Sequence, residues 1–290
     1  MLLISAIVSG LAVGSMYGLI ALGYHVTYTV SNTVNFSQGS SMMLGAVLGY
    51  TFAIKYGWPL PLAVAMALLL CALFGLLVER TLVRPFAERG SNAWLMATVA
   101  GGIVLDNIVL FTFGKEPRGF PSILAQKPIE LFGTGVYPLQ LVIPAVGLGI
   151  AIALQLALQH TRHGKALLAA VQNKDAARLM GVNVRLAIAF SFALSTALAG
   201  LAGLLIAPLF SVHSDMGTIF GIKAFAVAIL GGITSASGVM LAGLIYGLIE
   251  ALVTSYFGST YTQIVVFLVV IIALALMPNG LLGRAATKKV

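Results

Sequence analysis

The stretch MLLISAIVSGLAVGSMYGLIALGY, residues 1–24, contains no charged side chain, and none follows before Lys55. A helix needs about 20 apolar residues to cross a hydrocarbon core of ~30 Å. The stretch has no basic n-region and no evident cleavage site with small residues, so we expect a retained span and not a signal peptide. It therefore predicts a membrane-spanning helix.

The composition of the whole chain supports the same interpretation. Of its 290 residues, 60% are hydrophobic and only 8% are charged, whereas about a quarter are charged in soluble domains. These values exclude a soluble enzyme and a disordered chain. A single cysteine, Cys71, excludes a disulfide framework and is expected to pack as a small hydrophobe. The net charge of +8 indicates membrane topology and not nucleic-acid binding.

Further apolar runs lie at about 36–54, 60–78, 92–113, 137–158, 186–210, 238–258 and 261–278. A shorter run, residues 221–233, is too short to cross comfortably and predicts a broken or re-entrant helix. We therefore expect an all-α polytopic membrane protein. It would be a bundle of about 8 to 9 transmembrane helices with broken or re-entrant segments, forming a single transmembrane domain over residues 1–290.

Basic residues divide unevenly among the connections, and lysine and arginine collect in cytoplasmic loops. The expected cytoplasmic set is Arg80, Arg84, Arg89, Arg162, Lys165, Lys174, Arg178, Arg185, Arg284, Lys288 and Lys289. The remainder, expected on the opposite side, are Lys55, Lys115, Arg118, Lys127 and Lys223. This division places the N-terminus outside, and it places the C-terminus inside if the short run also crosses.

Glycines recur at intervals of four residues within three of these runs. They are Gly10, Gly14 and Gly18, then Gly45 and Gly49, then Gly243 and Gly247. Small residues at this spacing let the backbones of membrane helices approach closely. Chance spacing in a glycine-rich chain is the alternative.

Motifs for ATP hydrolysis, metal binding and redox chemistry are absent from the sequence. The Gly164-Lys165 pair is followed by alanine and lacks the upstream glycine of a phosphate-binding loop. HExxH and CxxC do not occur, and the four histidines are scattered. We expect no catalytic residues, no metal site and no cofactor, so the chain is not predicted to be an enzyme.

Two carboxylates, Asp106 and Glu250, lie deep within apolar runs. Each would cost about 2.5 to 3.5 kcal/mol at a helix centre, so such residues usually face the bundle interior. One interpretation is a role in a pathway or in gating. The other is an interhelical anchor, with Asp106 bonded to Asn107 and Glu250 to a hydroxyl or amide. No intramembrane lysine or arginine is expected beside them.

Two polar breaks interrupt the apolar expanse, an early one at residues 27–46 and a late one at residues 229–243. Polar, glycine-broken backbone survives at membrane depth only when it is buried in protein or faces a cavity. Paired discontinuities in the two halves of a transporter indicate the substrate path, and interfacial loops are the alternative. The candidate pathway residues are Asn35, Ser37, Gln38, Gly39, Ser40, Gly231, Gly232, Ser235, Ser237 and Gly238.

The longest polar segment on the expected cytoplasmic side is TRHGKALLAAVQNKDAARLMGVNV, residues 161–184. It predicts a short amphipathic helix that ends at Gly181. The apolar side is formed by Leu167, Leu168, Val171, Leu179 and Met180. Such a helix lies on anionic lipid or docks into a partner protein.

These stretches together resemble the LivH-type permeases of ABC importers for branched-chain amino acids. The resemblance rests on GLIALGYHVTYTVSNTVNFSQGSSMMLGA, ERTLVRPF, GIKAFAVAILGGITSASGVMLAGLIYGLIEAL and MPNGLLGR, in the family's order, and on residues 161–184. It implies that residues 161–184 couple the permease to its ATPase. The implied coupling residues are Gly164, Lys165, Gln172, Asn173, Asp175, Arg178, Leu179 and Gly181. Gln38-Gly39-Ser40 departs from the family's His-Gly-Glu, and Gln172 replaces a frequent acidic residue.

The resemblance implies a multi-pass subunit of the inner membrane that moves branched-chain or related amino acids inward. Its partners would be cytoplasmic ABC ATPase subunits, a second permease subunit (LivM-type or a copy of itself), a periplasmic substrate-binding protein and membrane lipid, with no nucleic acid. Urea and short amides are alternative substrates. The rival classes are a stand-alone secondary transporter or channel and a structural membrane anchor.

Overall fold

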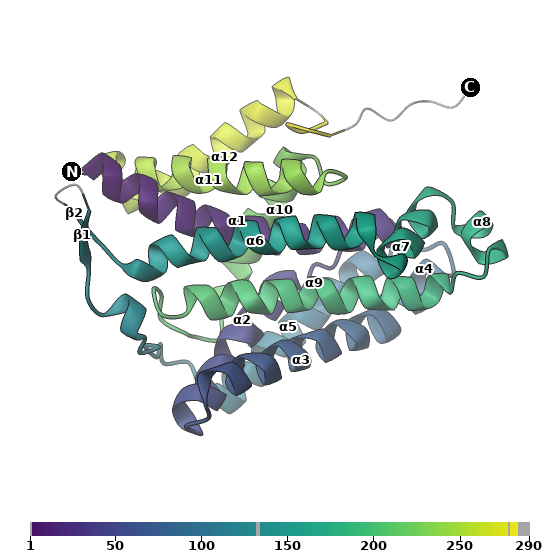
Figure 1. The fold of residues 1–290 in the computed structure, drawn as a ribbon, viewed down its shortest axis with the longest axis horizontal. Helices are drawn as coiled ribbons and strands as arrows, with labels where there is room; N and C mark the ends of the chain where they lie inside the picture. Colours follow the sequence, from purple (N-terminus) through teal and green to yellow (C-terminus); the bar gives the residue numbers. More distant parts are fainter. Residues whose placement is uncertain (1, 132–133, 278, 284–290) are drawn as a thin grey trace.

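The computed structural model describes residues 2–131, 134–277 and 279–283 and is almost entirely helical (Figure 1). Within these residues, 7 helices are long and apolar enough to cross a membrane. They are α1 (Leu2–Ser31), α3 (Leu60–Val78, continued to Ala87), α5 (Trp94–Phe113), α6 (Pro138–His160), α9 (Val184–Ile206), α11 (Ala236–Phe257) and α12 (Ser259–Leu276). The prediction of an all-α polytopic membrane protein is confirmed.

Two shorter apolar helices complete the bundle. The run expected at residues 36–54 is formed by α2 (Gln38–Tyr50), which widens into the π-helical turn η1 (Thr51–Lys55). The short run at residues 221–233 lies largely in α10 (Met216–Gly231), which has 16 residues. Both helices pack inside the bundle and against each other, α2 mainly against α9 and α10 mainly against α1 and α11.

Closely packed glycines hold α1 against α11 in the middle of the bundle. A Cβ atom on Gly14 would lie 2.6 Å from the carbonyl oxygen of Gly243, and one on Gly10 would lie 2.9 Å from that of Gly247. Such backbone contact is how helices associate where lipid removes the hydrophobic drive. The expected close packing at these spaced glycines is confirmed.

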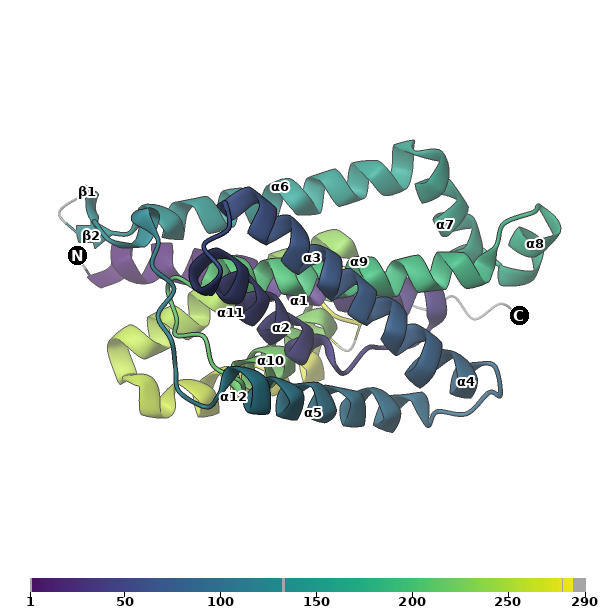
Figure 2. The ribbon, with the colours of Figure 1, turned by 90° about the horizontal axis from the view of Figure 1, so that it is seen from below.

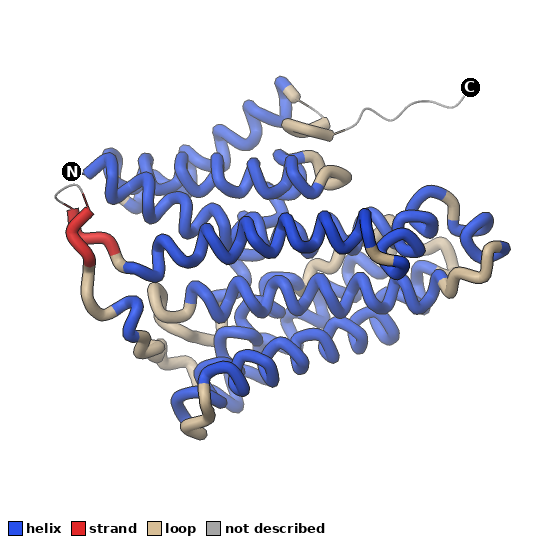
Figure 3. The backbone as a smooth tube through the Cα atoms, in the orientation of Figure 1, coloured by secondary structure: helices blue, strands red, loops and turns tan. Residues whose placement is uncertain are grey.

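The two ends of the bundle differ (Figures 1 and 3). One end carries η2 (Glu79–Val83), α4 (Arg84–Ala87), α7 (Arg162–Gln172) and α8 (Lys174–Leu179). The other end carries η3 (Ile123–Ala125) and an antiparallel hairpin of β1 (Ile129–Leu131) and β2 (Thr134–Val136), in which Glu130 pairs with Gly135.

Most basic residues follow the expected division between these two ends. Lys223 does not, because it lies in the middle of α10 and is buried. Its expected position on the outer side was therefore wrong. Arg284, Lys288 and Lys289 lie outside the described residues.

Candidate functional site

The early break forms the corner between α1 and α2, and most of its polar side chains are used in packing. Asn35 and Ser37 are buried, and the side-chain Oδ1 of Asn35 accepts bonds from the Ser37 amide at 3.1 Å and from the Ser37 hydroxyl at 2.6 Å. Gln38 donates to the Ser195 carbonyl at 2.9 Å and accepts from the Ser195 hydroxyl at 3.0 Å. These contacts join α2 to α9 in the interior.

The next two residues of the break, Gly39 and Ser40, line a pocket of about 230 Å³ between α1, α2, α5 and α10. Asp106 of α5 lines the same pocket. The remaining walls are Tyr24, Phe36, Val99, Gly102, Ile103, Thr218, Gly221, Ile222 and Phe225. The structure thus brings one candidate carboxylate together with two candidate pathway residues.

Contacts between helices fix the walls of this pocket. The Tyr24 hydroxyl donates to the carbonyl of Gly221 at 3.3 Å, which ties α1 to α10. The Phe225 ring lies 5.4 Å from the Tyr24 ring and 5.1 Å from the Phe36 ring. The Thr98 hydroxyl accepts a bond from the Phe36 amide at 3.3 Å, which holds α5 against the early break. The site is therefore built on packed helices.

Asp106 has a carboxylate oxygen, Oδ1, that is buried without a hydrogen-bond partner among the described residues. The side chain of the neighbouring Asn107 is exposed and donates to the carbonyl of Ile103 at 2.8 Å. The expected pairing of Asp106 with Asn107 is therefore wrong. It fails because consecutive residues of a helix project in different directions.

Glu250 of α11 has a charged partner on the neighbouring helix. Its Oε1 lies 2.5 Å from the Nζ of Lys223, and the two side chains are only 16% and 9% exposed. The Lys223 ammonium also lies 5.9 Å from the centre of the Tyr17 ring. The expectation that Glu250 bonds to a hydroxyl or amide, with no intramembrane base nearby, is wrong. Lys223 lies within the apolar run at residues 221–233. Asp106 and Glu250 were singled out as charged residues within apolar runs, and the same criterion would have identified Lys223 as an intramembrane base.

The ion pair borders a second pocket, of about 430 Å³, between α1, α10 and α11. Tyr17, His213, Asp215 and Thr254 are among its polar lining residues. The described residues contain no group of three or more His, Cys, Asp and Glu side chains that could hold a metal ion. Neither pocket therefore has the ligand set of a metal centre.

The late break lies elsewhere and packs on the end of the described chain. Ser235 caps α11 by accepting a bond from the Gly238 amide at 3.2 Å, and its hydroxyl lies 3.3 Å from that of Ser237. The Gly231 carbonyl accepts a bond from the Leu282 amide at 3.3 Å. Gly232 has a φ of +84°, and a Cβ there would lie 2.6 Å from the Cα of Gly283. None of these residues lines the pocket that contains Asp106.

Segment 161–184 forms two helices joined at Asn173. Asn173 is extended, with φ of −157°, and its side chain caps α8 by accepting a bond from the Ala176 amide at 3.0 Å. Gly164 packs α7 against the end of α6, since a Cβ there would lie 2.5 Å from the Cα of Leu158. Gly181, with φ of +83°, ends the segment. The prediction of one continuous helix was therefore wrong, although the end at Gly181 is confirmed.

The side chains of this segment divide into buried and exposed sets. Leu167 is buried, whereas Leu179 and Met180 are 89% and 84% exposed at the tip. Lys165, Gln172 and Arg178 are also exposed. The side chain of Asp175 lies outside the described part of the chain. The expected single apolar side is therefore split between the interior and solvent.

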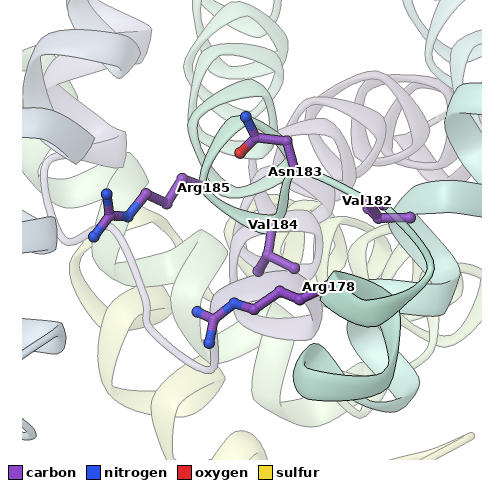
Figure 4. A pocket seen from close by; sticks show the side chains of 6 residues that line it. Arg178, Val182, Asn183, Val184 and Arg185 are labelled. Atoms are coloured by element: carbon purple, nitrogen blue, oxygen red, sulfur yellow. The ribbon is translucent and has the colours of Figure 1, made fainter.

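An open pocket of about 420 Å³ lies between α8 and the start of α9. Figure 4 shows Arg178 and Arg185 extending to the same side of it, from α8 and from α9. Arg185 also forms a 3.0 Å ion pair with Glu88, in the connection after α4. The basic connections at this end therefore meet on one surface, and Figure 2 shows α7 and α8 projecting at that end.

A bundle of apolar helices long enough to cross a membrane, with a basic segment that projects at one end, defines a polytopic membrane protein. The sequence matches the family described as "Branched-chain amino acid transport system / permease component" over residues 6–274. The chain therefore belongs to this family of ABC transporter permeases, and it is a multi-pass protein of the inner membrane.

Curated relatives match over nearly the whole length. The chain is 32% identical to the high-affinity branched-chain amino acid transport system permease protein LivH of Escherichia coli, covering 97% of this chain and 96% of the relative. It is also 32% identical to BraD of Pseudomonas aeruginosa, covering 98% and 97%. The ribose import permease RbsC of Escherichia coli is 28% identical, covering 91% and 83%.

A solved structure has a related fold. PsaBC from Streptococcus pneumoniae in complex with Fab matches with a TM-score of 0.50 and 13% identity, covering 92% of this chain and 90% of that chain. At this identity the likeness shows the fold alone.

Proposed function

We propose that the chain is the membrane-spanning permease subunit of a binding-protein-dependent ABC importer for branched-chain or related amino acids. The observation that carries this proposal is the family match over residues 6–274, with relatives that are 32% identical over almost their full length. ATP is hydrolysed by partner ATPase subunits, a binding protein delivers the solute from outside, and a second permease subunit completes the pathway. The chain itself performs no chemical reaction.

The segment of α7 and α8 is the proposed contact with the ATPase. Exposed large apolar side chains that project from a basic surface are typical of protein-binding sites, and Leu179 and Met180 provide them. A helix can transmit force only if its own position is fixed. Here Gly164 packs α7 on α6, and Thr161 caps α7 by accepting a bond from the Gly164 amide at 3.0 Å.

The test uses the assembled importer in proteoliposomes, with Leu179→Asp in this chain. We expect leucine uptake and leucine-stimulated ATP hydrolysis to fall together, and co-purification of the ATPase to weaken. Leu124→Asp is the matched control, because Leu124 is an exposed leucine of η3 at the other end of the bundle. Gly164→Trp is unsuitable, because any side chain there collides with α6 and disturbs the fold.

Three outcomes would contradict the proposal. Normal uptake and ATPase retention by Leu179→Asp would remove the coupling role. If uptake and ATP hydrolysis changed only with the anionic lipid content, the segment of α7 and α8 would be assigned to the membrane surface. Leucine uptake by proteoliposomes that contain this chain alone would favour the stand-alone transporter.

A further inference from the structure

Asp106 is a carboxylate in the membrane region without a compensating charge beside it. Among the described residues that line its pocket there is no lysine, arginine or histidine. Its Oδ1 has no hydrogen-bond partner in the described part of the chain. Charges within membrane proteins usually pair with one another or face a pathway. The described walls of the pocket therefore supply the Ser40 hydroxyl as a hydrogen-bond partner but no opposite charge, which leaves a place for a cationic ligand.

The pocket has one polar corner and apolar walls. Asp106 and the Ser40 hydroxyl form the polar corner, and Gly102 brings α5 close to α2 there, since a Cβ on it would lie 3.0 Å from the Ser40 oxygen. Val99, Ile103, Ile222 and Phe225 supply aliphatic and aromatic surface around them. A volume of about 230 Å³ suits a small solute with a cationic head and a compact apolar body.

We propose that Asp106 binds the ammonium group of the transported amino acid, while the branched aliphatic side chain lies against Val99, Ile103 and Ile222. This inference rests on the proposed function and assigns to it a cargo-binding residue. An ammonium can form a charge-assisted hydrogen bond with the carboxylate, which is about twice as strong as a neutral one. The Ser40 hydroxyl is positioned to accept a second bond.

A hard metal cation fits this pocket poorly. Calcium takes six to eight oxygen ligands and magnesium demands an octahedral set, whereas Asp106 is the only carboxylate among the described lining residues. A monovalent cation such as sodium is the remaining alternative, and the experiment below includes it.

The experiment measures protection of a cysteine placed in the pocket wall. Thr218→Cys, in a Cys71→Ala background of the assembled importer, introduces a thiol of similar size on α10 at an exposed lining position. Its reaction with a small water-soluble thiol reagent is followed with leucine, with 3-methylbutylamine, which keeps the ammonium, or with 4-methylpentanoate, which keeps only the carboxylate. We expect leucine and the amine to slow labelling and the acid to have no effect.

Substituting Asp106 then tests its part directly. In Asp106→Asn, protection by the amine should require about ten to a hundred times more ligand, whereas Asp106→Glu should retain it. Asn107→Ala is the matched control, because Asn107 is the next residue of α5 and lies outside the pocket. This variant should behave like the parent.

The inference is overturned if the acid protects as well as the amine, if Asp106→Asn keeps full protection, or if no ligand protects the parent. It is also overturned if exchanging sodium for choline alone changes labelling as much as the amine does. Leucine uptake by the same importer is measured in parallel. Uptake without protection refutes the role of Asp106 alone, whereas absence of uptake of every branched-chain amino acid refutes the proposed function.

Discussion

Asp106 and Glu250 look alike in the sequence, but their surroundings in the structure are opposite. Each is a lone acid in an apolar helical run. Glu250 contacts Lys223 at 2.5 Å, whereas Asp106 borders a pocket whose described walls carry no base. Helix α10 lies between them, with Lys223 on one face and Ile222 on the other.

This difference shows two ways of placing a charge in a membrane. Desolvation of a charge costs several kcal/mol, and a close partner of opposite sign repays much of that cost inside the protein. At Glu250 the partner belongs to the fold and joins α10 to α11. At Asp106 no charged side chain of the described pocket walls offsets the desolvation cost. This is expected of a residue whose charged partner is the ammonium group of the transported amino acid.

The largest expected effect comes from breaking the ion pair on one side. Lys223→Met leaves Glu250 buried and unpaired, which should destabilise the protein by about 3 to 5 kcal/mol. We expect a large loss of folded protein in the membrane and a lower unfolding temperature in detergent. Both are measured by fluorescence-detected size exclusion after heating.

The double variant Lys223→Met/Glu250→Met is the control for lost packing. Replacement of a buried ion pair by apolar side chains of similar volume is often neutral, so it should recover most of the lost stability. Wild-type stability in Lys223→Met alone would show that the Lys223–Glu250 contact does not anchor α10, and the comparison would fail.

The second effect has the opposite sign. Asp106→Leu removes an unpaired charge and should raise the free energy of unfolding by up to about 2.5 kcal/mol, the lower figure for an acid at a helix centre. Leucine uptake should be lost, because the cargo loses its charged contact. Thermal unfolding and uptake are measured on the same preparation, with Glu250→Leu as the opposing control, since that variant leaves Lys223 unpaired and should be less stable. Destabilisation by Asp106→Leu would show that Asp106 has a structural partner.

The fold could be predicted largely from the sequence, because each membrane span is a long apolar run that is almost free of charged residues. The runs at residues 60–78 and 92–113 agree closely with α3 and α5. The spaced glycines at Gly14 and Gly243 also predicted close packing correctly, since only small residues permit backbone contact. The π-helical turn after α2 and the extended Asn173 could not be foreseen, because tertiary packing determines both.

The candidate site was less predictable, because the partner of a side chain is set by helix rotation and tilt. Lys223 and Glu250 are 27 positions apart, and their contact depends on how α10 packs against α11. Ser40 and Gln38 lie in one polar break, yet one lines a pocket and the other bonds to Ser195 in the core. Composition identifies such a polar break, but it does not show which of its residues line a pocket and which pack in the core.

The smallest expected effect sharpens the description of the Glu250 side. Tyr17 is fully buried, its ring packs edge-on against Tyr246 at 5.3 Å, and its hydroxyl forms no hydrogen bond of standard geometry, although it interacts with the Glu250 carboxylate. Oε2 of Glu250 is likewise buried without one. An unsatisfied buried hydroxyl costs free energy, so Tyr17→Phe should leave stability unchanged or raise it by up to about 1 kcal/mol. The contact between the ring at position 17 and Lys223 remains in this variant. Thermal unfolding is measured for Tyr17→Phe and for the matched variant Tyr246→Phe. A loss of more than about 1 kcal/mol in Tyr17→Phe alone would mean that its hydroxyl donates to Glu250, and that the acid depends on two partners and not on Lys223 alone.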